Sequence, residues 1–272
     1  MLDTVLLFFA DGLLFFPAFL TGLCLAGFLA LLGCYLRLRR ETLAALAYAQ
    51  AGAAGTLAAM SLEMPLVLGG LATALGAAGV KQVGIRRPVW GTQPGTLYAL
   101  LLLFAWAVGV LLTSNLPLAE RLGRALFDGQ LLLSGGEALV WVVPACILGM
   151  LLLQRASKAL LLIQLFPDMA RLQPRYVRIS ARLFDAIAAL GIGMATLSLG
   201  VMAVFALILI PAWIAFTRQR SWRVALWSSV RMALLVYGFA FASALGLDQP
   251  FGPILVMALL LLGLVVRKAP VA

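Results

Sequence analysis

A series of apolar segments, each close to the length of a membrane span, is the feature that most constrains this chain. A helix needs about 20 mostly apolar residues to cross the hydrocarbon core of a bilayer. Hydrophobic residues make up 64% of the 272 residues and charged residues 11%, against about 45–50% and about 25% in soluble domains. We therefore predict an all-α fold, a polytopic transmembrane helical bundle with about eight or nine spans. The candidate spans are residues 18–36, 43–61, 64–80, 96–113, 138–154, 183–200, 203–217, 224–244 and 252–266.

The chain is predicted to form one transmembrane domain between two short flanking segments. Residues 1–17 are apolar but contain Asp3 and Asp11. We expect an interfacial N-terminal segment there, with an additional first span as the alternative. Residues 18–268 form the transmembrane domain, and residues 269–272 form a C-terminal tail.

The positive charges indicate how the chain is oriented in the membrane. Most of the 20 Lys and Arg residues lie in the segments 37–40, 81–87, 155–182, 218–223 and 267–268, on one side of the predicted bilayer. Cytoplasmic loops carry an excess of Lys and Arg. We therefore expect the N-terminus outside and the C-terminus inside the cell.

The composition excludes several kinds of active site. The chain has no His, which is the commonest metal ligand and general base. Its three cysteines, Cys24, Cys34 and Cys146, lie in apolar segments without a C-x-x-C pair, and we expect them to be buried. No catalytic triad, Walker A loop or G-x-G-x-x-G motif is present. We therefore expect a non-catalytic chain that binds no cofactor and no nucleic acid.

The longest cytoplasmic connection contains a short helix. In residues 162–180, LIQLFPDMARLQPRYVRIS, Pro167 opens the helix and Pro174 ends it. Asp168 in its first turn favours the positive end of the helix dipole. Two interpretations remain open, an ordinary interfacial helix or a helix that docks on a soluble partner.

Two further proline motifs lie in the C-terminal third. Pro211 lies in the middle of a predicted helix, where it removes a backbone hydrogen bond and favours a kink. The apolar run 183–217 is broken only by Gly and Pro, so the boundary between its two spans is not sharply defined. A rigid turn before the last span is formed by Asp248, Pro250, Gly252 and Pro253.

Five motifs in this order resemble those of the ABC-3 permease family, the membrane subunits of zinc/manganese/iron-type ABC importers. Gly33 with Arg39 and Arg40 is similar to the glycine and paired basic residues that end the family's first conserved helix. The other four are residues 125–130 (ALFDGQ), similar to Leu-Phe-Gly-Asp, residues 166–170 (FPDMA), similar to Asp-Pro-Glu-x-Ala, residues 209–212 (LIPA), similar to Ile-Ile-Pro-Ala, and residues 248–253 (DQPFGP), similar to Asp-x-Pro-x-Gly-Pro. The resemblance covers nearly the whole chain.

This resemblance implies the permease fold of the metal-type ABC importers and a set of partners. Two copies would form a homodimer around a central pathway, within the lipid of a prokaryotic inner (plasma) membrane. A cytoplasmic ABC ATPase dimer, which binds ATP and Mg, would drive transport. An extracytoplasmic solute-binding protein would deliver a metal ion or a metal chelate for import.

The resemblance also implies roles for individual residues. A coupling helix near residues 166–174 would contact the ATPase, through Phe166, Pro167, Asp168, Met169, Ala170 and Arg171. The translocation pathway would include Leu46, Gln50, Pro211, Asp248, Pro250, Gly252 and Pro253.

One position departs from the family pattern. The family's second helix carries Gly-Asp-x-Leu-x-His-Ala-x-x-x-x-Gly, and its Asp and His line the metal route. A gapless alignment from Arg39 and Arg40 places Leu46 at the Asp and Gln50 at the His, whereas a shift of one turn would place Glu41 at the Asp and lose the paired-Arg match. Gln50 supplies neither charge nor a strong metal ligand, but it can hydrogen-bond a polar solute or an already ligated metal. Alternatively it joins two helices and does not contact the solute.

The sequence also contains candidate thioether ligands and leaves other classes of transport protein open. Met60 and Met64, with Glu63 between them, are further candidates for a soft metal because thioethers suit Cu(I). The same architecture could move a non-metal polar solute.

A secondary carrier or channel is a further alternative, and it would need intramembrane charges. The sequence places only Arg231 deep in a span, where we expect it to snorkel.

Overall fold

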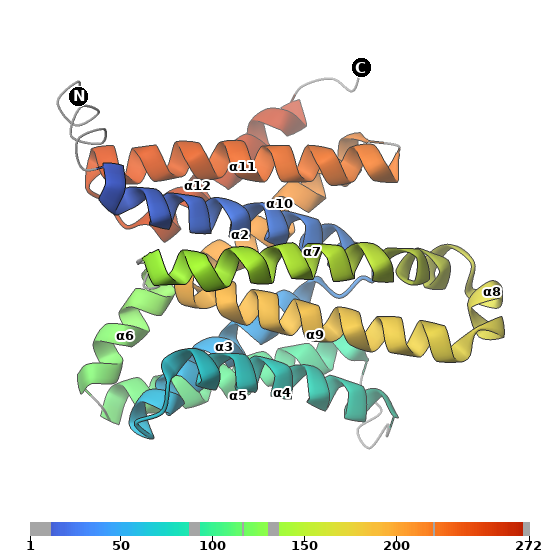
Figure 1. Cartoon of the computed structure of the whole chain (residues 1–272), viewed down its shortest axis with the longest axis horizontal. Coiled ribbons are helices and arrows are strands. Elements are labelled where there is room, and N and C mark those ends of the chain that lie inside the picture. Colours follow the sequence, from blue (N-terminus) through green and yellow to red (C-terminus); the bar gives the residue numbers. More distant parts are fainter. Residues whose placement is uncertain (1–11, 87–92, 116, 130–135, 220, 269–272) are drawn as a thin grey trace. The chain divides into compact units, whose positions relative to one another are not determined.

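The computed structural model of the chain describes residues 12–86, 93–115, 117–129, 136–219 and 221–268. Within these ranges every regular element is an α-helix (Figure 1), which confirms the predicted fold class. The helices are α2 Gly12–Leu38, α3 Thr42–Ser61, α4 Leu66–Arg86, α5 Pro94–Asn115, α6 Pro117–Asp128, α7 Gly136–Leu165, α8 Pro167–Leu172, α9 Pro174–Leu199, α10 Val201–Arg218, α11 Trp222–Leu247 and α12 Phe251–Lys268.

Eight of the described helices are long and apolar enough to cross a membrane. They are α2, α3, α4, α5, α7, α9, α10 and α11, and α12 adds a shorter apolar segment at Phe251–Val266. The prediction of about eight or nine spans is therefore confirmed. Residues 1–11 and 269–272 lie outside the described residues, so the interfacial segment 1–17 and the C-terminal tail stay predictions, although α2 already begins at Gly12.

Helix α6 occupies a segment for which the sequence predicted no helix. It begins at Pro117 and carries Glu120 in its first turn, and both are favourable at a helix N-terminus. Its 12 residues are too few to cross a membrane. The segment therefore lacks the long apolar run by which the other helices were predicted.

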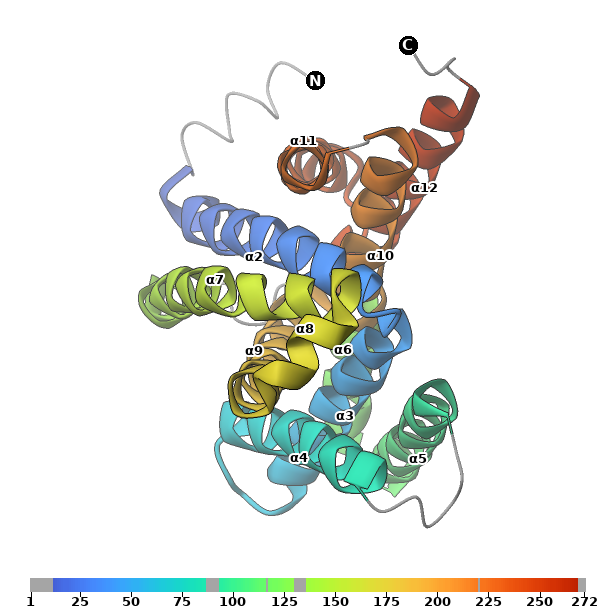
Figure 2. The ribbon, with the colours of Figure 1, turned by 90° about the vertical axis from the view of Figure 1, so that its right-hand side faces the viewer.

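The chain forms two compact units. Unit 1 comprises Met1–Cys34, Arg124–Cys146 and Ala195–Ala272, and unit 2 comprises Tyr35–Gly123 and Ile147–Met194. In unit 1, helices α10, α11 and α12 pack against one another (Figure 2). In unit 2, α3 packs against both α4 and α5.

Close backbone approaches hold unit 1 together. A Cβ added at Gly33, the glycine of the first motif, would overlap the carbonyl of Ile208 on α10. The α9–α10 boundary, which the sequence left undefined, lies at Gly200, whose φ of +82° is a left-handed conformation. Gly129 approaches this corner with a φ of +71°, and a Cβ on Gly200 would lie 2.8 Å from the Gly129 Cα. Glycine is required at both positions because a side chain there would be both strained and obstructed.

Small residues also allow helix backbones to approach closely in unit 2. A Cβ at Gly55 of α3 would overlap Thr73 of α4, and one at Gly52 would lie 3.2 Å from the Gly193 Cα on α9. The Thr73 hydroxyl donates to the Ala51 carbonyl at 2.8 Å. Small residues let membrane helices approach until their backbones touch. The alanine- and glycine-rich sequence of α3 therefore places this helix at the centre of unit 2, where most of it is buried.

Candidate functional site

Helix α3 buries a primary amide among small side chains. Gln50 is 5% exposed, and Leu46, one turn earlier on the same helix face, is half-buried. Neighbouring positions 49, 51, 53 and 54 are all alanine. No hydrogen bond to the Gln50 side chain is found among the described residues. A buried amide is costly without partners. Within the same described ranges, the Tyr48 hydroxyl of this helix is also buried without a hydrogen-bond partner, so α3 carries two such polar groups.

Close to the start of α3, unit 2 contains a buried cluster of four charges. The Lys81 Nζ on α4 lies 2.8 Å from Glu41 Oε2 and 2.7 Å from Asp185 Oδ1 on α9. The Arg39 Nη2 lies 3.2 Å from Glu41 Oε1 and 3.3 Å from Asp185 Oδ1. Lys81 is 1% exposed and Asp185 4%. Two cations and two anions thus form a neutral cluster that joins the α2–α3 turn to α4 and α9.

The backbone of the α2–α3 turn is shaped to bring these charges together. Arg40 has a φ of +57°, a left-handed conformation that L-residues rarely adopt. Glu41 is the N-cap residue of α3, but its side chain makes no capping hydrogen bond and pairs with Arg39 and Lys81 instead. Burial lowers the pKa of Arg39, but the Asp185 and Glu41 carboxylates raise it by more, so the guanidinium stays charged. The Arg39 guanidinium also lies 4.8 Å from the centre of the Phe184 ring.

This cluster corrects the expectation that Arg231 is the only charge placed deep in a span. Lys81 and Asp185 lie inside the span-length segments Leu66–Gly84 and Pro174–Leu199, whereas the sequence placed Lys81 in a loop. The ion pair joins residues that are 104 positions apart, so the pattern within either segment does not predict it. Arg231 is exposed on α11, with its Nε 3.4 Å from the Trp227 carbonyl oxygen, so its snorkelling stays a prediction.

The predicted short helix is present as α8, between the ends of α7 and α9 (Figure 1). It begins at Pro167 and carries Asp168 in its first turn, as expected, while Pro174 starts the next helix, α9. Among the predicted docking residues, Phe166, Asp168 and Met169 are exposed. Pro167, Ala170 and Arg171 belong to the same helix, but their side chains are outside the described part. Leu165 and Leu172 add further exposed apolar surface, so α8 and its flanks present a surface suited to a partner.

The other predicted pathway residues lie in unit 1. Pro211 is buried inside α10, which continues past it to Arg218. Asp248 ends α11 in the left-handed conformation, with a φ of +51°. The predicted turn is short, because α12 already begins at Phe251. Pro250 therefore precedes α12, and Gly252 and Pro253 lie in its first turn, with Gly252 buried.

The thioether candidates lie at the α3–α4 turn of unit 2. Met60 is half-buried near the end of α3, whereas Glu63 and Met64 are exposed in the turn. Glu63 has a left-handed φ of +55°. Within the described ranges, His, Cys, Asp and Glu nowhere form a group of three or more able to hold a metal ion. Cys34 and Cys146 are buried as expected, and Cys24 is half-buried.

Comparison with known proteins extends these observations. The sequence model described as the ABC 3 transport family matches residues 13–268. The fold is similar to PsaBC from Streptococcus pneumoniae, solved in complex with Fab, with a TM-score of 0.80, 18% identity, and 93% of this chain and 91% of that chain covered. It is also similar to an inward-facing conformation of a transporter described as a metal-chelate type ABC transporter, with a TM-score of 0.72 and 18% identity over 93% of this chain and 87% of that chain. No curated protein sequence matches the chain significantly.

Proposed function

The chain belongs to the ABC 3 transport family, and on this premise we propose that it imports a metal ion or a metal chelate. It is a multi-pass permease of a prokaryotic inner membrane, with eight span-length helices among its described residues. The observation that carries the proposal is the family match over residues 13–268. The metal-chelate type of one structural neighbour supports the same class of solute.

The buried Gln50 amide favours a metal that arrives already ligated. A bare divalent cation in a low-dielectric pathway needs charge or strong ligands to replace its water. Gln50 and Leu46 supply neither, but an amide can hydrogen-bond the oxygen or nitrogen atoms of a chelate. The burial of Gln50 within α3 is consistent with a contact inside the protein.

We further propose that α8 docks on an ABC ATPase. The exposed Met169 and Leu172 of α8, with Phe166 just before it, would fill a pocket on that subunit. ATP with Mg would bind to the ATPase rather than to this chain. A second copy of the chain would complete the pathway. An extracytoplasmic solute-binding protein would deliver the solute near the α11–α12 turn, where Asp248 is exposed.

The elemental content of cells with and without this chain, grown under metal limitation, tests the proposal. We expect one metal to fall selectively on deletion and to recover when the wild-type chain is restored. An unchanged content of every metal would refute metal import. Co-purification with an ATPase is the second measurement, and ATP-independent uptake by the purified chain would indicate a secondary carrier or channel.

A non-metal polar solute is the second candidate, because the Gln50 amide suits any solute that offers hydrogen-bonding groups. The Leu46→Asp, Gln50→His double variant tests the alignment that places these two residues on the family's metal route. For a metal route, the new carboxylate and imidazole are expected to give measurable divalent-metal binding. If calorimetry detects no metal binding to a folded double variant, the alignment that places these residues on the metal route is wrong.

A further inference from the structure

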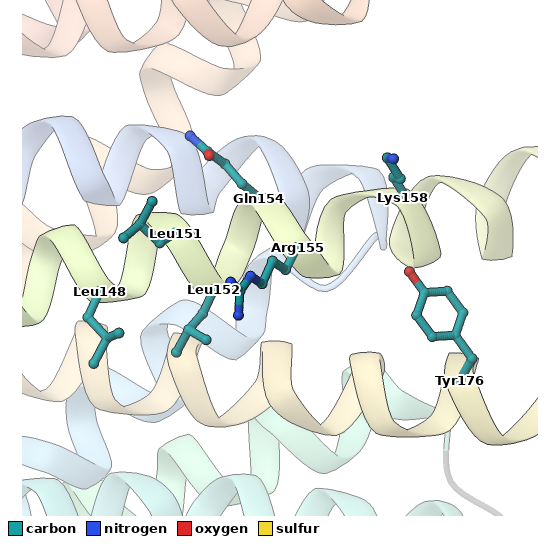
Figure 3. Close-up of a pocket in the computed structure, with 7 residues that line it drawn as sticks. All are labelled: Leu148, Leu151, Leu152, Gln154, Arg155, Lys158 and Tyr176. Carbon is teal, nitrogen blue, oxygen red and sulfur yellow. The ribbon is translucent and has the colours of Figure 1, made fainter.

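A cavity of about 600 Å³ lies between α7 and α9 in unit 2. Figure 3 shows the seven residues that line it. Six come from α7, and Tyr176 comes from the first turn of α9. The lining residues are Leu148, Leu151, Leu152, Gln154, Arg155, Lys158 and Tyr176.

The lining changes in character along α7. Leu148, Leu151 and Leu152 occupy one helix face, and Arg155 and Lys158 continue that face one and two turns later. All of these positions lie within the span-length segment Leu139–Leu165. The lining is therefore apolar at Leu148, Leu151 and Leu152 and basic toward the α8 end of the helix.

The basic half has no acidic partner. Arg155 and Lys158 are exposed, and neither forms an ion pair within the described residues. Figure 3 shows the Arg155 side chain pointing toward α9 and the Tyr176 hydroxyl pointing toward α7, whereas the Lys158 side chain points away from α9. Two cations without an acidic partner and a hydroxyl donor therefore line one end of the cavity, and the long, exposed Lys158 side chain can turn toward a phosphate group that Arg155 and Tyr176 hold there.

We propose that this cavity binds one anionic phospholipid of the cytoplasmic leaflet. Arg155 and Lys158 would pair with the phosphate, Tyr176 would donate a hydrogen bond to it, and an acyl chain would lie along the three leucines. Basic pockets between membrane helices on the cytoplasmic side bind anionic headgroups. The positive-inside distribution puts Arg155 and Lys158 on that side. A free phosphate ion would leave the leucine half of the cavity without a ligand, so a lipid fits the lining better.

This site would lie between the two helices that α8 connects. The α7 helix ends at Leu165, α9 begins at Pro174, and the cavity joins the two helices within unit 2. A bound lipid would therefore hold together the two helices that α8 connects.

The test compares phosphatidylglycerol binding to the full-length chain and to two double variants in detergent, counted by native mass spectrometry. The Arg155→Gln, Lys158→Gln variant is expected to bind phosphatidylglycerol at least about 10-fold more weakly, since each basic residue contributes about 1 kcal/mol of attraction. The matched control is Arg175→Gln, Arg178→Gln, which removes two exposed charges from the same cytoplasmic region outside the cavity lining. It is expected to change binding by less than about threefold.

Three other results would overturn the proposal. Equal losses in both double variants would indicate diffuse attraction to the membrane surface. Displacement of phosphatidylglycerol by millimolar inorganic phosphate would indicate a site for small anions. If the Arg155→Gln, Lys158→Gln variant keeps its lipid but loses its dimer in size-exclusion chromatography, the cavity is an interface with a second copy.

Discussion

The Lys81 ammonium and the Asp185 carboxylate, 104 residues apart in the sequence, lie 2.7 Å apart and are almost completely buried. Glu41 and Arg39 complete the cluster, so the buried charges balance. Such a cluster contributes little net stability over an apolar core, but removing a single member leaves an uncompensated charge inside the protein. The cluster therefore fixes how α3, α4 and α9 pack in unit 2.

A variant that removes one charge of this cluster is predicted to be strongly destabilised. Lys81→Met should lower the free energy of unfolding by about 3–5 kcal/mol. The Lys81→Met, Asp185→Leu double variant keeps the Arg39–Glu41 pair and should be less destabilised than Lys81→Met alone. Thermal unfolding in detergent micelles measures both, with the exposed Arg231→Gln as the control. Additive losses in the double variant would show that the two residues do not stabilise each other.

Substitution of the buried amide is predicted to alter transport but not folding. Gln50→Ala should weaken the apparent affinity for the solute about 2- to 10-fold, the equivalent of one hydrogen bond of about 0.5–1.5 kcal/mol. Uptake is measured at matched expression. Thr56→Ala, which removes a hydroxyl that donates to the Gly52 carbonyl on the same helix, is the control for general damage to α3. Unaltered uptake kinetics in Gln50→Ala would assign Gln50 to helix packing.

Charge reversal on α8 is predicted to separate ATP hydrolysis from transport. Asp168→Lys or Arg171→Glu should leave the complex with the ATPase assembled but reduce uptake per ATP hydrolysed, because α8 would transmit the motion. Uptake and hydrolysis are measured together in reconstituted vesicles. Arg223→Glu, which reverses an exposed charge of unit 1 on the same predicted side of the membrane, is the control. Wild-type coupling in both α8 variants would leave α8 as an interfacial helix without a docking role.

The glycine at the α9–α10 corner is predicted to be irreplaceable. Gly200→Ala should destabilise the protein by about 1–2 kcal/mol or more, since its φ of +82° is strained for alanine and the new Cβ would press on Gly129. Gly238→Ala on α11 is the matched control in the same unit, because a Cβ there meets nothing within 4 Å. It should raise stability by up to about 1 kcal/mol. Unfolding temperatures that fall equally in both variants would contradict this reading of the corner.

The sequence predicted those features that depend on one segment at a time. Span-length apolar runs identified the membrane helices, and Pro167 with Asp168 correctly indicated the start of α8. The charge cluster could not be predicted in this way, because Lys81 follows its predicted span and its partner Asp185 lies on another helix, so the pair forms only when α4 and α9 pack. A carboxylate inside an apolar run, as at Asp185, is the signal that could have indicated a buried partner.

The composition of α3 has a further consequence for how a solute could be accommodated. From Ala49 to Gly55, Gln50 is the only residue whose side chain has rotatable bonds that change its shape. Alanine and glycine lose no side-chain entropy on burial, so this stretch packs as an inflexible surface. If this stretch lines the route, its own adjustment to solutes of different size would come from the rotamers of Gln50, and selectivity at α3 would depend on that single side chain.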